Sequence, residues 1–135
     1  MLLRDACEFL VPAGWVCASL DLPSHGAQIQ PGEPEGIAGW RWRLERGQDP
    51  VAQNTERVAA MVADLVRRNF SDPQRLAVSG ISRGGFMAAH AAIDSPSAGF
   101  RAVGLLSPVT NLSLLTGQLS QILIIAPITP LPAYA

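Results

Sequence analysis

The sequence predicts an α/β domain with a mostly parallel sheet and flanking helices. Two observations lead to this prediction. Short apolar runs alternate with helical segments along the chain, and residues 75–93 have the pattern of a strand, a tight turn and a helix. Such alternation is typical of parallel sheets, because neighbouring parallel strands are joined through a crossover helix. At 135 residues the chain forms at most one domain and is long enough to enclose a hydrophobic core.

The N-terminal part predicts a helix, a strand and a long loop. Residues 2–11 carry apolar side chains at helical spacing, and Pro12 and Gly14 end this helix. Trp15–Leu20 is a short apolar run, typical of a strand that is buried on both faces. Residues 27–49 are rich in glycine and proline and predict a loop. Its tryptophans and arginines favour cation–π packing that pins the loop, with a substrate cleft as the alternative.

The C-terminal part continues the alternation. Asp49 and Pro50 have the types expected of an N-cap and a first-turn proline, so they predict the start of a helix. Three segments then predict a strand, a helix and a strand: Arg75–Ser79, Gly84–Ile93 and Phe100–Leu106. Gln121–Ala126 is a candidate for one more strand. We therefore expect a partial domain over residues 1–126 and an unstructured, proline-rich tail over residues 127–135.

Composition excludes several classes of function. The net charge of −1 gives no reason to expect nucleic acid or an anionic membrane as a partner. All ten basic residues are arginine, which excludes a phosphate-binding loop that depends on lysine. Cys7 and Cys17 lack the spacing of a zinc site and are expected to be reduced thiols, so no metal or cofactor is predicted. No apolar run reaches the roughly 18 residues of a membrane span, and a cytoplasmic protein is expected.

The strongest functional signal is the pattern Gly-x-Ser-x-Gly at Gly80, Ser82 and Gly84. It lies between a predicted strand and a predicted helix, which is the context of a nucleophile elbow. A serine hydroxyl is a weak nucleophile and needs a tight turn that projects its oxygen toward a substrate. The two glycines leave room for the strand and the helix to approach closely. Ser82 is therefore the candidate nucleophile, and an ordinary structural turn is the alternative.

The helix after Ser82 supplies a candidate oxyanion site. Its N-terminus carries N–H groups without intrahelical acceptors and the positive end of the helix dipole. Both features favour negative charge that develops on a substrate oxygen. The backbone N–H of Arg83 is the predicted donor.

These motifs resemble the α/β-hydrolase superfamily, most closely its prolyl oligopeptidase-like and dienelactone hydrolase-like branch. The resemblance rests on residues 14–16 leading to 21–26, on 80–85 and on 106–108, and it covers about residues 1–115. It makes Trp15–Leu20, Arg75–Ser79 and Ala102–Leu106 similar to the fourth, fifth and sixth strands of that fold.

The resemblance implies a serine hydrolase that cleaves an ester or peptide bond of a small-molecule or peptide substrate through an acyl-enzyme on Ser82. It also implies a positive φ angle at Ser82. The fold would be partial, without the N-terminal strands and the C-terminal part of the superfamily. The third strand of that fold lies between the fourth and fifth. Its absence predicts either an exposed parallel edge or a non-native pairing.

The catalytic partners of Ser82 are not evident. In the superfamily an acid and then a histidine follow the serine along the chain. Here only His90 and Asp94 follow, and His90 lies on the order of 10 Å along the same helix. The resemblance makes His25 part of a structural turn. We therefore expect an inactive fragment of a serine hydrolase, or alternatively a non-catalytic module that a partner chain completes.

Overall fold

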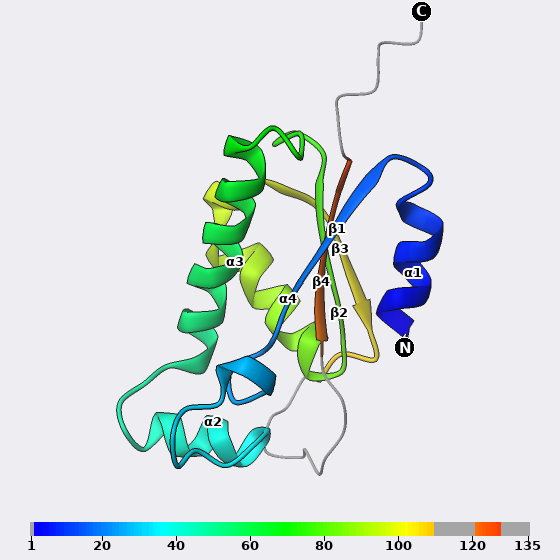
Figure 1. The fold of residues 1–135 in the computed structure, drawn as a ribbon. Coiled ribbons are helices and arrows are strands. Elements are labelled where there is room, and N and C mark those ends of the chain that lie inside the picture. Colours follow the sequence, from blue (N-terminus) through cyan, green and yellow to red (C-terminus); the bar gives the residue numbers. More distant parts are fainter. Residues whose placement is uncertain (1, 110–120, 128–135) are drawn as a thin grey trace, which may run out of the picture.

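The computed structural model describes residues 2–109 and 121–127 (Figure 1). Helices and strands alternate along most of this part of the chain, which confirms the α/β prediction. Several bounds match the sequence prediction to within two residues. In chain order the elements are α1 (Leu2–Leu10), β1 (Trp15–Leu20), the 3₁₀ turn η1 (Gly26–Gln28), α2 (Ile37–Leu44), α3 (Pro50–Arg67), β2 (Leu76–Ile81), α4 (Arg83–Asp94), the 3₁₀ turn η2 (Pro96–Ala98), β3 (Phe100–Leu106) and β4 (Gln121–Pro127).

The four strands form one sheet in the order β1-β4-β2-β3. β2 and β3 pair in parallel, whereas β4 pairs antiparallel with both β1 and β2. Three strands therefore run in one direction and β4 runs against them. β4 occupies the position for which we expected either an exposed edge or a non-native pairing, and the structure shows a pairing. Residues 128–135 of the expected tail lie outside the described residues.

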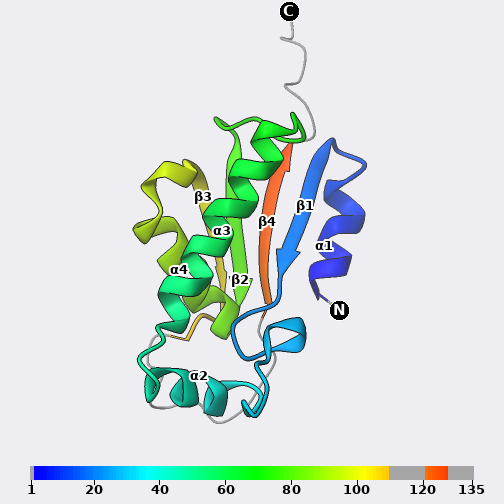
Figure 2. The ribbon, with the colours of Figure 1, turned by 60° about the vertical axis from the view of Figure 1, so that its left-hand side comes forward.

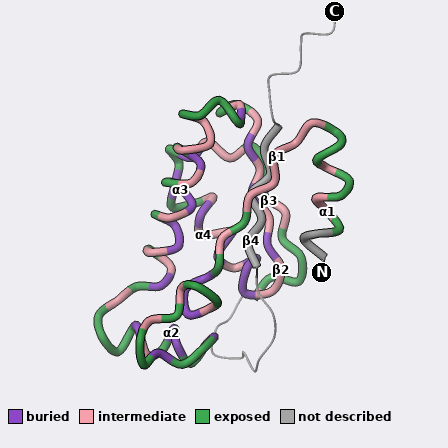
Figure 3. The backbone as a smooth tube through the Cα atoms, viewed as in Figure 1, coloured by how far each residue is buried: buried purple, intermediate pink, exposed green. Residues whose placement is uncertain are grey.

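Two helices cover one face of the sheet, and a third lies on the other. α3 and α4 pack side by side over β2, while α1 lies against β1 on the opposite side (Figures 1 and 2). The core lies beneath α3 and α4 and is coloured purple in Figure 3. Its members are apolar side chains from the turn after β1 and from α2, α3, β2, α4 and η2: Leu22, Trp40, Val58, Val62, Leu76, Val78, Met87, Ala88, Ala91 and Ala98. No helix in the described ranges is long and apolar enough to cross a membrane.

The long helix α3 begins as the sequence predicts. The carboxylate of Asp49 accepts hydrogen bonds from the backbone N–H groups of Val51 at 2.8 Å and Ala52 at 3.1 Å. Pro50 is the first helical residue, where its missing N–H costs nothing. The cap and the proline together fix where this helix starts, directly after the segment that follows β1.

The prediction of a loop over residues 27–49 is wrong in part, because this segment contains α2. Helix α2 has almost no amphipathic pattern, and tertiary contacts hold it in place. A Cβ atom on Gly39 would lie 2.2 Å from the carbonyl oxygen of Pro34 and 2.4 Å from Cβ of Ser24. Only glycine therefore fits where α2 crosses this turn. The expected cation–π contact is present between Arg46 and Trp42, at 3.9 Å.

The two outer strands are only partly buried, and for β1 this differs from the prediction. β1 is half-buried along most of its length rather than buried on both faces. β3 pairs with β2 on one side, and among the described residues no strand pairs with its other side. Val103, Leu105 and Leu106 of β3 are 44%, 43% and 50% exposed. In the part of the chain that the structure describes, the sheet thus ends on an apolar strand whose outer edge has no strand partner.

A buried ion pair holds the segment that connects β1 to α3. Nε of Arg43 on α2 donates to Oε1 of Glu33 at 2.5 Å, and both side chains are almost fully buried. The same carboxylate accepts hydrogen bonds from Oγ of Ser24 at 2.5 Å and from the backbone N–H of Gln30 at 2.6 Å. The hydrogen bond from Arg43 is the main cause that lowers the pKa of Glu33 to about 2, against the opposing effect of burial.

We expect Glu33→Gln to lower the free energy of unfolding by about 3–5 kcal/mol at neutral pH, because it leaves the Arg43 charge buried without a counter-ion. Urea denaturation measures this change. Glu45→Gln is the matched control: its partner Arg41 is 83% exposed, so the loss should stay below about 1 kcal/mol. Equal effects of the two substitutions would contradict a special role for the buried pair.

The same pair predicts a pH dependence. The pKa of Glu33 is about 2 in the folded chain and 4.5 in the reference state, so its ionised form favours folding. This stability is present above pH 4.5 and is lost as the pH falls from 4.5 toward 2. The difference in stability between wild type and Glu33→Gln should therefore shrink over this range.

Candidate active site

Ser82 stands alone between a strand and a helix. β2 ends at Ile81, α4 begins at Arg83, and Ser82 has φ of 55° and ψ of −119°. This positive φ is the value that the resemblance implied for a nucleophile. Ser82 is the N-cap residue of α4, but its side chain makes no capping hydrogen bond. The hydroxyl therefore does not stabilise the N-terminus of α4 by a capping hydrogen bond.

The tight turn depends on a contact between two stretches of backbone. A Cβ atom on Gly80 would lie 2.1 Å from the carbonyl oxygen of Gly84 and 2.6 Å from the amide nitrogen of Gly85. Backbone atoms cannot move aside as a flexible side chain can, so position 80 requires glycine. The close approach of β2 and α4 leaves one residue, Ser82, to reverse the chain.

The end of β3 clamps the Ser82 turn. The N–H of Ser82 donates to the carbonyl oxygen of Leu106 at 3.0 Å, and the N–H of Val109 donates to the carbonyl oxygen of Ser82 at 3.1 Å. A Cβ atom on Gly85 would lie 3.1 Å from Pro108, so this proline packs against the first turn of α4. Strand, turn and clamp together hold Ser82 in a conformation that a non-glycine residue rarely adopts.

Arg83 is more than a backbone donor. Its N–H belongs to the first turn of α4, where N–H groups point toward the helix N-terminus. Its side chain is 7% exposed and reaches the N-cap of α2, since a Cβ atom on Gly36 would lie 3.1 Å from its Nη1. Burial lowers the pKa of Arg83, and the nearby charge of Glu35 opposes this effect. The sequence carried no signal for this contact between α4 and α2.

His90 and Asp94 lie on α4 and contact each other. Nδ1 of His90 is 2.9 Å from Oδ2 of Asp94, and the two side chains are 38% and 49% exposed. The His90 ring also packs against Phe86, with 4.6 Å between the ring centres. Eight residues separate His90 from Ser82 along the helix, which corresponds to roughly 12 Å at the α-helical rise. The structure does not bring this pair to the Ser82 hydroxyl.

His25 is part of the turn that follows β1. Its Nδ1 lies 2.9 Å from the carbonyl oxygen of Pro23, and the same oxygen accepts a hydrogen bond from Nε1 of Trp40 at 2.6 Å. Trp40 in turn packs between His25 and Phe86. These contacts fit the structural turn that the resemblance implied. Among the described residues no cluster of three or more His, Cys, Asp or Glu side chains forms a metal site.

The fold and the turn at Ser82 together define the central segment of an α/β-hydrolase domain. Residues 35–124 match the model of the prolyl oligopeptidase family, and this match covers α2 through most of β4. The chain belongs to the prolyl oligopeptidase family, whose members are serine hydrolases in general. No curated protein and no solved structure matches the chain.

We expect Gly80→Ala to lower the free energy of unfolding by more than about 3 kcal/mol, because its Cβ atom would overlap the backbone of α4. Thermal and urea denaturation measure the loss. Gly104→Ala on β3 is the matched control, since its Cβ atom would meet side-chain atoms of Ser79, Oγ at 3.0 Å and Cβ at 3.3 Å, which need to shift by only a few tenths of an ångström. The control should change stability by less than about 1 kcal/mol. Comparable losses in both variants would contradict the backbone contact.

We expect Ser82→Gly to stabilise the fold or leave it unchanged, because glycine removes backbone strain of about 1–3 kcal/mol at this positive φ. Ser79→Gly, in the regular part of β2, should instead lower stability by about 0.5–1 kcal/mol. The two urea midpoints should therefore move apart. A fall in the Ser82→Gly midpoint equal to that of Ser79→Gly would contradict strain at Ser82.

Proposed function

We propose that Ser82 is the nucleophile of a serine hydrolase that cleaves ester or peptide bonds of a small-molecule or peptide substrate. The observation that supports this most is its position, at positive φ between β2 and the N-terminus of α4, with a hydroxyl that caps no helix. In this mechanism a general base takes the proton of Ser82 as its oxygen attacks the carbonyl carbon, and the ester or peptide bond breaks. The alcohol or amine leaves with that proton, and water then hydrolyses the acyl-enzyme to the acid and free Ser82. The backbone N–H of Arg83 donates to the oxyanion.

The acid and the base of the triad come, in this proposal, from outside these 135 residues. Residues 102–135 contain no Asp, Glu or His, and His90 is paired with Asp94 on the same helix as Ser82. The second oxyanion donor would also come from outside these residues, from the loop after the third strand of the superfamily, which precedes this segment. The 135-residue chain should therefore not turn over substrate by itself.

A hydrolysis assay tests this proposal in two steps. The 135-residue chain and its Ser82→Ala variant should hydrolyse p-nitrophenyl acetate at the same rate, because an unassisted serine adds nothing. A rate that falls in Ser82→Ala would show that the base lies within the chain.

In the second step, the coding DNA on both sides of this segment is read for an Asp and a His. The longer protein that it encodes is then produced and labelled with a fluorophosphonate. Ser82→Ala should abolish labelling, while Ser79→Ala should retain it.

The alternative is a non-catalytic module in which the turn is architecture and a partner chain completes the sheet. The open edge of β3, with its exposed Val103, Leu105 and Leu106, favours this reading. The labelling experiment separates the two functions. A folded longer product that no fluorophosphonate labels at Ser82 would favour the module and count against the hydrolase.

A further inference from the structure

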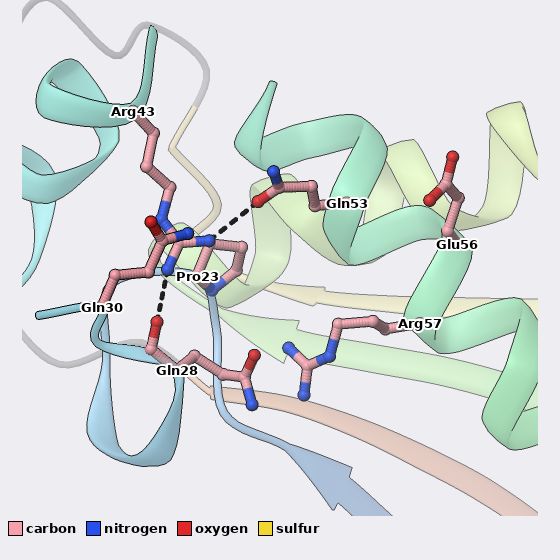
Figure 4. A pocket seen from close by; sticks show the side chains of 7 residues that line it. All are labelled: Pro23, Gln28, Gln30, Arg43, Gln53, Glu56 and Arg57. Carbon is pink, nitrogen blue, oxygen red and sulfur yellow. Dashed lines mark hydrogen bonds between the residues drawn. The ribbon is translucent and has the colours of Figure 1, made fainter. Parts of the chain in front are cut away.

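A polar cavity of about 280 Å³ lies between the turn after β1 and the first two turns of α3 (Figure 4). It shares no residue with the Ser82 turn. Four separate segments meet around it: the turn at Pro23, the end of η1 with the loop behind it, α2 and α3. All but one of the lining residues are polar or charged, so the cavity suits a polar ligand and not an apolar one.

Arg43 forms one wall, and its charge is already neutralised. Its Nε pairs with Glu33, its Nη2 donates to the carbonyl oxygen of Gln28, and its Nη1 donates to Oε1 of Gln53 at 2.8 Å. The last contact fixes the orientation of the Gln53 amide, because arginine only donates and must face the oxygen. The NH₂ group of Gln53 is therefore turned away from Arg43.

Arg57 supplies the positive charge of the cavity. Its Nη1 donates to the carbonyl oxygen of Asp21 at 2.9 Å, and its other N–H groups have no hydrogen-bond partner among the described residues. Figure 4 shows its guanidinium facing the side-chain amide of Gln28. That amide likewise has no partner among the described residues. The cavity thus presents one half-buried guanidinium and the side-chain amide of Gln28 as donors.

Glu56 limits which anions fit. Its carboxylate lies at the rim of the cavity: Glu56 is exposed, and Figure 4 shows its side chain pointing away from the guanidinium of Arg57. A negative charge at the rim of the cavity disfavours dianions more than monoanions. The two oxygens of a monocarboxylate can accept in parallel from the fork of a guanidinium.

We propose that this cavity is a binding site for a small monocarboxylate, with the guanidinium of Arg57 holding its two oxygens and the amide of Gln28 donating beside it. The ligand lies across Trp40 from the Ser82 helix, because Trp40 donates to Pro23 on one side and packs against Phe86 on the other. The site is therefore separate from Ser82 and does not depend on its role.

Side-chain NMR of arginine Nε–Hε groups tests the proposal on the 135-residue chain. Sodium acetate is titrated against sodium chloride at equal ionic strength. We expect a saturable shift of the Arg57 signal and of the side-chain NH₂ signals of Gln28 with acetate, and none with chloride. The Gln28 signals report binding in the Arg57 variants, which lack the Arg57 signal. Arg57→Gln should weaken acetate binding at least about tenfold, since it removes a charge-assisted pair of hydrogen bonds. Arg67→Gln, at the far end of the same helix, is the control and should bind acetate as wild type does.

Two further variants keep the test decisive if Arg57→Gln fails to fold. Glu56→Gln should bind acetate several-fold more tightly, because it removes the like charge. Arg57→Lys retains the charge but loses the fork, so it should bind more weakly than wild type. Three results would overturn the proposal: no saturable acetate effect in wild type, unchanged affinity in both Arg57 variants, or tighter binding of phosphate than of acetate.

Discussion

The contact between the backbone of Gly80 and that of Gly84 and Gly85 is the constraint on which the Ser82 turn depends. It brings α4 so close to β2 that a single residue must reverse the chain, and this residue takes positive φ. The same approach brings Pro108 against the first turn of α4 and allows the carbonyl oxygen of Leu106 to reach Ser82. The position of a serine oxygen is thus set by glycines, which contribute no chemistry of their own.

A second, independent interaction, the buried ion pair between Glu33 and Arg43, holds the segment between β1 and α3 in place. The Glu33–Arg43 pair lies where an irregular backbone would otherwise leave buried polar groups without partners. Its hydrogen bonds reach the turn at Ser24, the loop at Gln30 and the side chain of Gln53 on α3. This network builds walls of the polar cavity, while Arg83 joins the start of α2 to α4. The polar cavity therefore depends on the Glu33–Arg43 network, whereas the Ser82 turn depends on the backbone contact at Gly80.

Local patterns in the sequence predicted the regular elements well. β1 and β3 have the predicted bounds, because their apolar runs are flanked by glycine or proline turns, and the Asp49 cap marks the start of α3. Helix α2 was missed because its sequence has no apolar face and includes Gly39, whose role is to fit against Ser24. The Glu33–Arg43 pair and the place of β4 within the sheet depend on contacts between distant residues, and no local pattern reports those. For Ser82, the motif predicted the turn but could not say which residues activate the hydroxyl.

The central place of β4 has a consequence for how the chain folds. β4 lies between β1 and β2, so Trp15 pairs with Pro127 and almost the whole chain separates the two partners. Pairings of such high sequence separation cost loop entropy before they gain contacts, and they slow folding. Among the described strands, β1 has no neighbour in the sheet until β4 has been made. Until then β1 and β2 each leave an apolar edge unpaired on the side that β4 later occupies.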